Sequence, residues 1–70
     1  MKRVAVSSST LSSVGYDPEK QVLEVAFRHG GVYQYLDVPV ATYQELMAAE
    51  SHGSYLARVI KPTHAFRRIQ

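Results

Sequence analysis

The alternation of hydrophobic and polar residues changes its period once along the chain, at Pro39. Upstream of this proline, Leu23, Val25 and Phe27 stand at every second position, which is typical of a half-buried strand. Downstream, apolar residues recur at the spacing of one face of a helix. The elements predicted by these periods are the strands of an antiparallel hairpin, over 22–28 and 32–36, and two helices, over 40–50 and 54–61.

Each predicted helix has an apolar face. The faces consist of Val40, Tyr43, Leu46 and Met47 in the first helix and of Tyr55, Leu56, Val59 and Ile60 in the second. Pro39 can open the first helix, because the amides of a first helical turn have no intrahelical partner. Gly53 separates the two helices, and Pro62 ends the second helix. Strands followed by helices indicate an α+β fold: a small antiparallel hairpin or meander with two short helices packed on one face.

The turn between the hairpin strands decides which residues face the helices. At 29–31 the sequence His-Gly-Gly can supply the positive φ of a tight turn. A two-residue turn would place Tyr33 and Tyr35 on the other face of the sheet from Phe27. A three-residue turn pairs Phe27 with Tyr33 and groups the large apolar residues. Val25 then lies opposite Tyr35, and we expect both tyrosines to face the helices.

The segment before the hairpin predicts a turn and an earlier strand. Asp17-Pro18-Glu19-Lys20 is typical of a type I turn, in which the Asp17 carboxylate accepts hydrogen bonds from turn amides. The serine-rich stretch 7–13 is expected to be exposed and to lead into a first strand at Val14.

The composition limits the classes of protein that the chain can represent. With 70 residues, 46% of them hydrophobic, it has room for one domain, over 1–70. A core of this size provides only about 3–5 kcal/mol of stability. The absence of cysteine excludes disulfides and thiolate zinc sites. The apolar stretch after Met1-Lys2-Arg3 is too short for a signal peptide, and no window is long enough to span a membrane. We therefore expect a cytoplasmic protein.

Catalytic patterns are missing from the sequence. No Gly-x-Ser-x-Gly elbow accompanies the serines, and no carboxylate pair has a spacing suited to acid–base chemistry. The three histidines, His29, His52 and His64, lack metal-ligand spacing. We expect no catalytic residues, no metal and no cofactor, and hence a binding domain rather than an enzyme.

An ordered set of short motifs runs through residues 23–55. These motifs are Leu23-x-Val25-x-Phe27, Tyr33-Gln34-Tyr35, Val38-Pro39 and Ser51-His52-Gly53-Ser54-Tyr55, with Ile60 after them. The set resembles the KTSC domain, a family found at the C-terminus of some lysyl-tRNA synthetases and as small free-standing bacterial proteins. The resemblance implies a stand-alone KTSC domain and, through the attachment to a tRNA enzyme, RNA as a partner.

The cationic residues are concentrated near the C-terminus. Four of the eight lysines and arginines lie in the last thirteen positions, which contain no acidic residue: Arg58, Lys61, Arg67 and Arg68. Such a cluster can contact phosphates. Alternatively, the first two complement the carboxyl end of the second helix and the last two keep a tail soluble.

Two further groups have a structural and a functional interpretation. Tyr33 and Tyr35 could stack on RNA bases, but the expected register favours burial; Tyr33 is kept as a candidate RNA contact. Ser51, Gly53 and Ser54 could bind an anion at a helix start. Serine is also a common helix cap, and glycine a common helix terminator.

Two functions from different classes remain open. The first is binding of tRNA-like RNA through phosphate contacts, without base specificity. The alternative is a protein-interaction module that forms a homodimer or docks on a larger protein. It would use a sheet edge or the sheet face bearing Val22, Val32 and Leu36, which is unusually apolar for a solvated surface.

Overall fold

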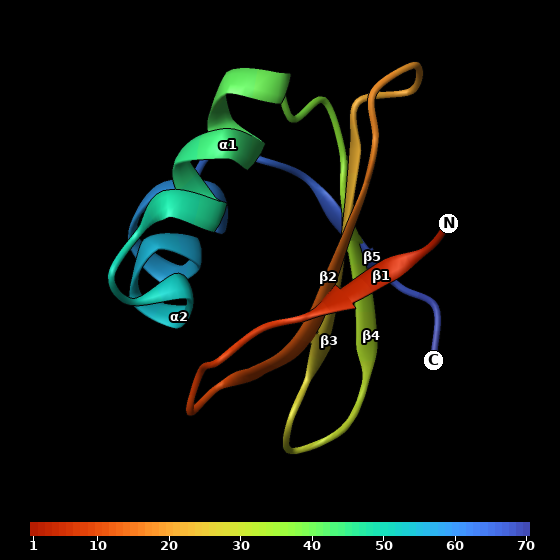
Figure 1. Ribbon diagram of the computed structural model, residues 1–70. Coiled ribbons are helices and arrows are strands. Elements are labelled where there is room, and N and C mark those ends of the chain that lie inside the picture. Colours follow the sequence, from red (N-terminus) through yellow and green to blue (C-terminus); the bar gives the residue numbers. More distant parts are fainter.

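The computed structural model describes residues 1–70 as an antiparallel sheet with helices on one of its faces (Figure 1). The five strands are β1 (Arg3–Ala5), β2 (Leu11–Asp17), β3 (Val22–Phe27), β4 (Val32–Tyr35) and β5 (Phe66–Arg68). The helices are α1 (Val40–Ala48), α2 (His52–Tyr55) and η1 (Leu56–Ile60), which is a turn of π-helix. The strand order is β1-β2-β3-β4-β5. Strands β1 to β4 form a meander, the helices connect β4 to β5, and the prediction of an α+β fold is confirmed.

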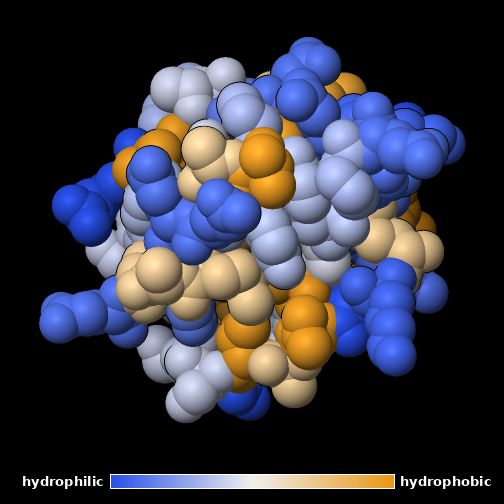
Figure 2. Space-filling view, turned by 45° about the horizontal axis from the view of Figure 1, so that its top comes forward, coloured by the Kyte–Doolittle hydropathy of each residue, from blue (hydrophilic) through white to orange (hydrophobic).

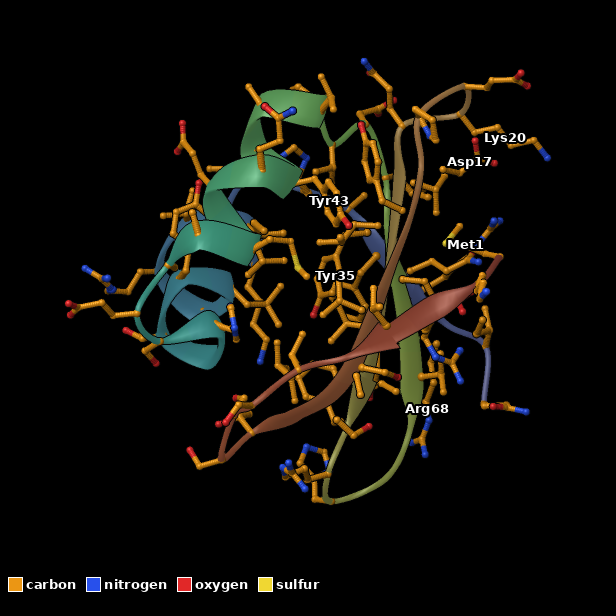
Figure 3. All side chains as sticks on the ribbon, viewed as in Figure 1. Met1, Asp17, Lys20, Tyr35, Tyr43 and Arg68 are labelled. Carbon is orange, nitrogen blue, oxygen red and sulfur yellow. The ribbon has the colours of Figure 1, made fainter.

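The helices cover the sheet face that carries Leu23, Val25 and Tyr35. These side chains are at most 2% exposed and pack in one core with Leu46 of α1 and Ile60 of η1. Figure 3 shows Tyr35 between the sheet and the helices. The predicted helix faces are only partly right.

Two of the predicted face residues are exposed. Val40 lies at the first position of α1 and is 49% exposed, and Val59 in η1 is 38% exposed. The helices are short, so only a narrow stripe of each one reaches the sheet.

The register of the β3–β4 hairpin differs from the predicted one by two residues. Tyr33 pairs with Val25 and Tyr35 with Leu23, so the expected pairing of Phe27 with Tyr33 is wrong. The three-residue loop is 28–30, because the Phe27 amide donates a hydrogen bond to the Gly31 carbonyl oxygen at 3.1 Å. A shift of two residues leaves every side chain on its face, and Tyr35 does face the helices.

Sequence patterns did not predict the two outer strands. β1 lies beside β2, with Val4 opposite Val14, and β5 lies beside β4, with Phe66 opposite Tyr35. Arg67 and Arg68 therefore belong to an edge strand. The interpretation of these two residues as part of a soluble tail is wrong. The turn at 17–20 is confirmed: the Asp17 carboxylate accepts hydrogen bonds from the amides of Glu19 and Lys20 at 3.0 and 3.2 Å.

Gly53 lies inside α2, so its predicted role as a separator of the helices is wrong. A Cβ atom built on Gly53 would lie 2.9 Å from Cβ and Oγ1 of Thr10, in the loop between β1 and β2. The absence of a side chain lets α2 approach this loop.

We expect Gly53→Ala to lower the free energy of unfolding by about 1 kcal/mol. The gain in helix propensity, about 1 kcal/mol, is outweighed by overpacking, which costs about 1–3 kcal/mol. Urea unfolding measures the difference. Thr10→Gly in the same chain removes the colliding atoms and should restore the stability; a stabilised Gly53→Ala variant would contradict the close approach.

Candidate functional site

A surface hollow of about 350 Å³ lies between the hairpin end of the sheet and the end of η1. Its lining residues are Phe27, His29, Tyr33, Tyr35, Lys61 and Phe66. We call this site the aromatic hollow. The rings come from β3, β4 and β5, because side chains at opposed positions of neighbouring strands point to the same face. None of the lining residues is acidic.

The rings of the aromatic hollow contact one another at angles that leave surface uncovered. Tyr33 meets Phe27 edge to face, with ring centroids 5.4 Å apart. Phe66 is tilted by 47° against Tyr33 and by 41° against Tyr35, at 5.7 and 5.9 Å. Phe66 remains 59% exposed, whereas Tyr35 is 2% exposed. Phe66 thus presents an aromatic surface to solvent at the mouth of the hollow.

The backbone around β5 holds Phe66 in place. The Leu36 amide donates a hydrogen bond to the Ala65 carbonyl oxygen at 2.9 Å. His64 Nδ1 donates one to the Leu36 carbonyl oxygen, also at 2.9 Å. Phe66 therefore begins a paired strand whose two preceding residues, His64 and Ala65, are both hydrogen-bonded to Leu36.

Two cations lie against the rings of the hollow. Lys61 follows η1, where its amide donates to the Leu56 carbonyl oxygen at 2.9 Å, and its Nζ lies 5.3 Å from the Phe27 centroid. The Arg68 guanidinium carbon lies 5.8 Å from the Tyr33 centroid. These are cation–π distances. Neither cation forms a salt bridge with an acidic side chain, since the one salt bridge in the structure joins Arg3 and Glu24. Arg68 Nε donates a hydrogen bond to the Gln70 backbone oxygen at 2.8 Å.

The four cations clustered in the sequence do not form one patch. Lys61 and Arg68 lie beside the aromatic hollow, while Arg67 points to the opposite face of β5, where its Nε donates to Gln34 Oε1 at 2.9 Å. Arg58 Nε donates to Ser54 Oγ at 3.1 Å on the helical layer. The alternation of a strand thus separates two adjacent arginines.

A row of polar residues, interrupted by one glycine, crosses the sheet face that the helices leave open. The row contains one residue from each strand in order: Arg3, Gly15, Glu24, Gln34 and Arg67. Arg3 forms the salt bridge with Glu24, and Gln34 Nε2 donates to Glu24 Oε1 at 2.9 Å. A Cβ on Gly15 would lie 2.8 Å from the Lys2 carbonyl oxygen. The absence of a side chain at Gly15 therefore lets the N-terminal segment that enters β1 lie close to β2.

Glu24 is 6% exposed. Burial by itself raises the pKa of the carboxyl, but hydrogen bonds from Gln34 and Arg3 and the charge of Arg3 outweigh it, and the pKa of Glu24 is lowered. The carboxylate is thus charged and paired. A second hollow beside it, about 220 Å³, is lined by groups of both charges, among them Asp17, Lys20 and Arg67.

Ser51 acts as a helix cap. Its Oγ accepts a hydrogen bond from the Ser54 amide at 3.2 Å, so that amide is occupied within the chain. Gly53 faces Thr10. The structure thus gives Ser51, Gly53 and Ser54 the structural roles of a cap and a close contact.

The sheet face proposed for protein docking is largely covered. Val22 and Val32 are 9% and 7% exposed, and Leu36 is half-buried. Backbone hydrogen bonds of Val32 with Ile69 and Gln70 extend the chain past this end of β4. The expectation of an open apolar surface at these residues is therefore wrong.

Several lining residues of the aromatic hollow escaped the sequence analysis. Phe66 lies in a strand of three residues, too short to show a period of two. The sequence places His29 in a turn and gives no sign that its ring stacks on Phe27, with the ring centroids 5.3 Å apart. The useful signal was an aromatic residue inside the terminal cationic cluster, since Phe66 directly precedes Arg67.

The structure contains neither a membrane-spanning helix nor a cluster of metal-binding side chains. No helix in the structure combines the length and the apolar character needed to cross a membrane. No three histidine, aspartate or glutamate side chains come together where they could hold a metal ion.

These observations define a small sheet-and-helix domain with an aromatic, cation-flanked hollow. The model of the KTSC domain family matches residues 7–64, and the chain belongs to this family. A crystal structure of a KTSC domain protein from Yersinia pestis superimposes with a TM-score of 0.95 at 45% identity, covering 99% of this chain and 97% of that one.

Relatives occur in more than one protein context. An uncharacterized protein of Stutzerimonas stutzeri is 52% identical over 64 residues, which are 91% of this chain and 90% of the relative. A lysine–tRNA ligase of Nostoc sp. is 31% identical over 61 residues, which are 87% of this chain but 11% of the ligase. The chain thus resembles a small part of that enzyme.

Proposed function

We propose that this KTSC domain binds RNA, in particular unpaired stretches of a tRNA-like molecule, through phosphate contacts beside the aromatic hollow. The observation that carries the proposal is the placement of Lys61 and Arg68. Each lies over a ring of the hollow, and neither forms a salt bridge with an acidic side chain. Arg68 donates one hydrogen bond, from Nε to the Gln70 backbone oxygen, and its other guanidinium N–H groups can still contact a phosphate. Cations next to aromatic surface are the combination that single-stranded nucleic acid requires.

The relatives support the same partner. A segment of the Nostoc lysine–tRNA ligase is related to this chain, and the name of that enzyme states that it acts on tRNA. Lys61 and Arg68 serve as the phosphate contacts. Arg58 lies on the helical layer and supports them, while Arg67, on the other sheet face, contributes little.

The salt dependence of RNA binding tests this proposal. Each phosphate neutralised on single-stranded RNA contributes about −0.7 to the slope of log affinity against log salt. We expect Lys61→Ala with Arg68→Ala to reduce the steepness by about 1.4 and to weaken binding of all sequences alike. Fluorescence anisotropy with unpaired oligonucleotides and with total tRNA at several salt concentrations measures both effects.

Lys20→Ala is the matched control, because it removes a charge at the other end of the sheet from Arg68 (Figure 3). It should leave the slope unchanged, and Arg67→Ala should change it little. Equal slopes for the parent and the double variant would show that Lys61 and Arg68 do not contact the phosphates. No RNA binding by the parent at low salt would contradict the function itself.

A second candidate function is self-association through the free edge of β1. All residues of Arg3–Ala5 are exposed, Val4 is 55% exposed, and an uncovered edge strand can pair with another chain. On the face shown in Figure 2, by contrast, hydrophobic residues lie in separate areas among polar ones. Sedimentation over a range of concentrations, at low and high salt, tests this alternative; dimers insensitive to salt would favour it.

A further inference from the structure

We propose that the aromatic hollow binds one unstacked nucleotide, with its base against Phe66 and Tyr33 and its phosphate at Lys61. This inference rests on the proposed RNA-binding function and specifies what the site recognises. The phosphate contacts alone would allow RNA to lie across the surface with every base outside the hollow.

The size of the hollow suits a single nucleotide. Pockets that enclose small ligands range from about 300 to 1,000 Å³, and the aromatic hollow, at about 350 Å³, lies at the lower end. A base stacked within a duplex cannot enter such a space, whereas an unpaired base can be turned out of its strand.

The lining has the chemistry of a base site. Phe66 offers an exposed aromatic surface, and Tyr33 and Tyr35 line the hollow beside it. Stacking on aromatic rings accepts every base because each base has a π-face. Because Tyr35 is only 2% exposed, the surface open to a base comes from Phe66 and the half-buried Tyr33.

The charges place the phosphate on one side of the base. Lys61 Nζ lies over one of the lining rings, that of Phe27, and it has no carboxylate partner. Arg68 lies against Tyr33 and can contact the next phosphate of a strand. An apolar or cationic ligand would leave Lys61 without a counter-charge. The combination of aromatic surface and a cation beside it therefore favours a ligand that joins a planar aromatic ring to an anionic group, as a nucleotide does with its base and its phosphate.

The test separates base recognition from phosphate recognition. Titrations of the ¹⁵N-labelled domain, followed by NMR, would use adenosine 5′-monophosphate, ribose 5-phosphate and a single-stranded hexanucleotide. We expect both base-containing ligands to shift the amides of Tyr33, Lys61 and Phe66, and ribose 5-phosphate to bind at least about tenfold more weakly. Phe66→Ala should weaken hexanucleotide binding roughly 5- to 140-fold, the range for loss of one stacked base.

Phe66→Leu keeps apolar surface without a π-face and should weaken binding nearly as much as Phe66→Ala. Thermal melting verifies that both variants remain folded, as expected for a residue that is 59% exposed. Hexanucleotide binding unaffected by either variant would overturn the inference about the hollow and leave RNA binding intact. Binding of the mononucleotide but not of RNA would support the hollow as a site for free nucleotides and overturn the RNA function. Binding of neither would overturn both.

Discussion

Replacing Tyr35 by alanine is expected to lower the free energy of unfolding by about 3–4 kcal/mol. Tyr35 is 2% exposed, belongs to the core between sheet and helices, and pairs with Leu23 and Phe66 on the flanking strands. Large-to-small changes of buried aromatic residues cost about 3–5 kcal/mol because they remove buried surface and leave a cavity.

A domain of this size has only about 3–5 kcal/mol of stability in total. The Tyr35→Ala variant should therefore keep at most about 2 kcal/mol of stability and unfold at much lower urea concentration than the parent, which circular dichroism with urea titration would detect. Tyr35→Phe retains the ring and should remain folded. Tyr33→Ala, at a half-buried position, should cost less. A Tyr35→Ala variant that melts like the parent but loses RNA affinity would show that Tyr35 acts as a binding residue instead of a core residue.

The sequence predicted the elements whose periods extend over several residues. The hairpin and both helices were found because the change of period at Pro39 is visible over segments of at least four residues. The register was wrong by two residues, because glycines at 30 and 31 both have positive φ and either can end the loop. The burial of Tyr35 was nevertheless right, since an even shift preserves the face.

The edge strands and the site were not predictable in the same way. β1 and β5 have three residues each and are specified by pairing with β2 and β4 rather than by a local pattern. The cationic cluster was interpreted as one patch because its members are close in sequence. In a strand, neighbours point to opposite faces, so Arg67 joined the polar row and Arg68 the hollow. The hollow itself needs Phe27 and Phe66, which are far apart in the chain.

Arg3→Met is expected to destabilise the domain by about 2 kcal/mol at neutral pH. The change removes the charge that pairs with Glu24 while keeping an unbranched side chain over Gly15. Hydrogen bonds to charged groups contribute about 1.5–3 kcal/mol, and a value in the lower half applies because the Arg3 side chain is 31% exposed. Glu24 then remains buried with Gln34 as its one side-chain partner.

The pH dependence identifies the source of this loss. The pKa of Glu24 is lowered in the folded parent, so its stabilisation is present above the ordinary glutamate value of about 4.3. It is lost as the pH falls through the lowered folded value. In Arg3→Met the burial of Glu24 still opposes ionisation, but the hydrogen bond and the charge of Arg3 no longer favour it. The difference in the free energy of unfolding between the variant and the parent should therefore shrink as the pH falls. Urea unfolding at pH 7 and pH 3 measures this change.

The double variant Arg3→Met with Glu24→Gln provides the matched control. Glutamine has a similar shape and no charge, so the unpaired buried carboxylate of the single variant is gone. We expect the double variant to be more stable than Arg3→Met at pH 7 and to have the same stability as Arg3→Met at low pH, where Glu24 is neutral. If both variants are equally destabilised at pH 7, the loss comes from packing of Arg3 over Gly15, and the polar row contributes no charge pairing to the fold.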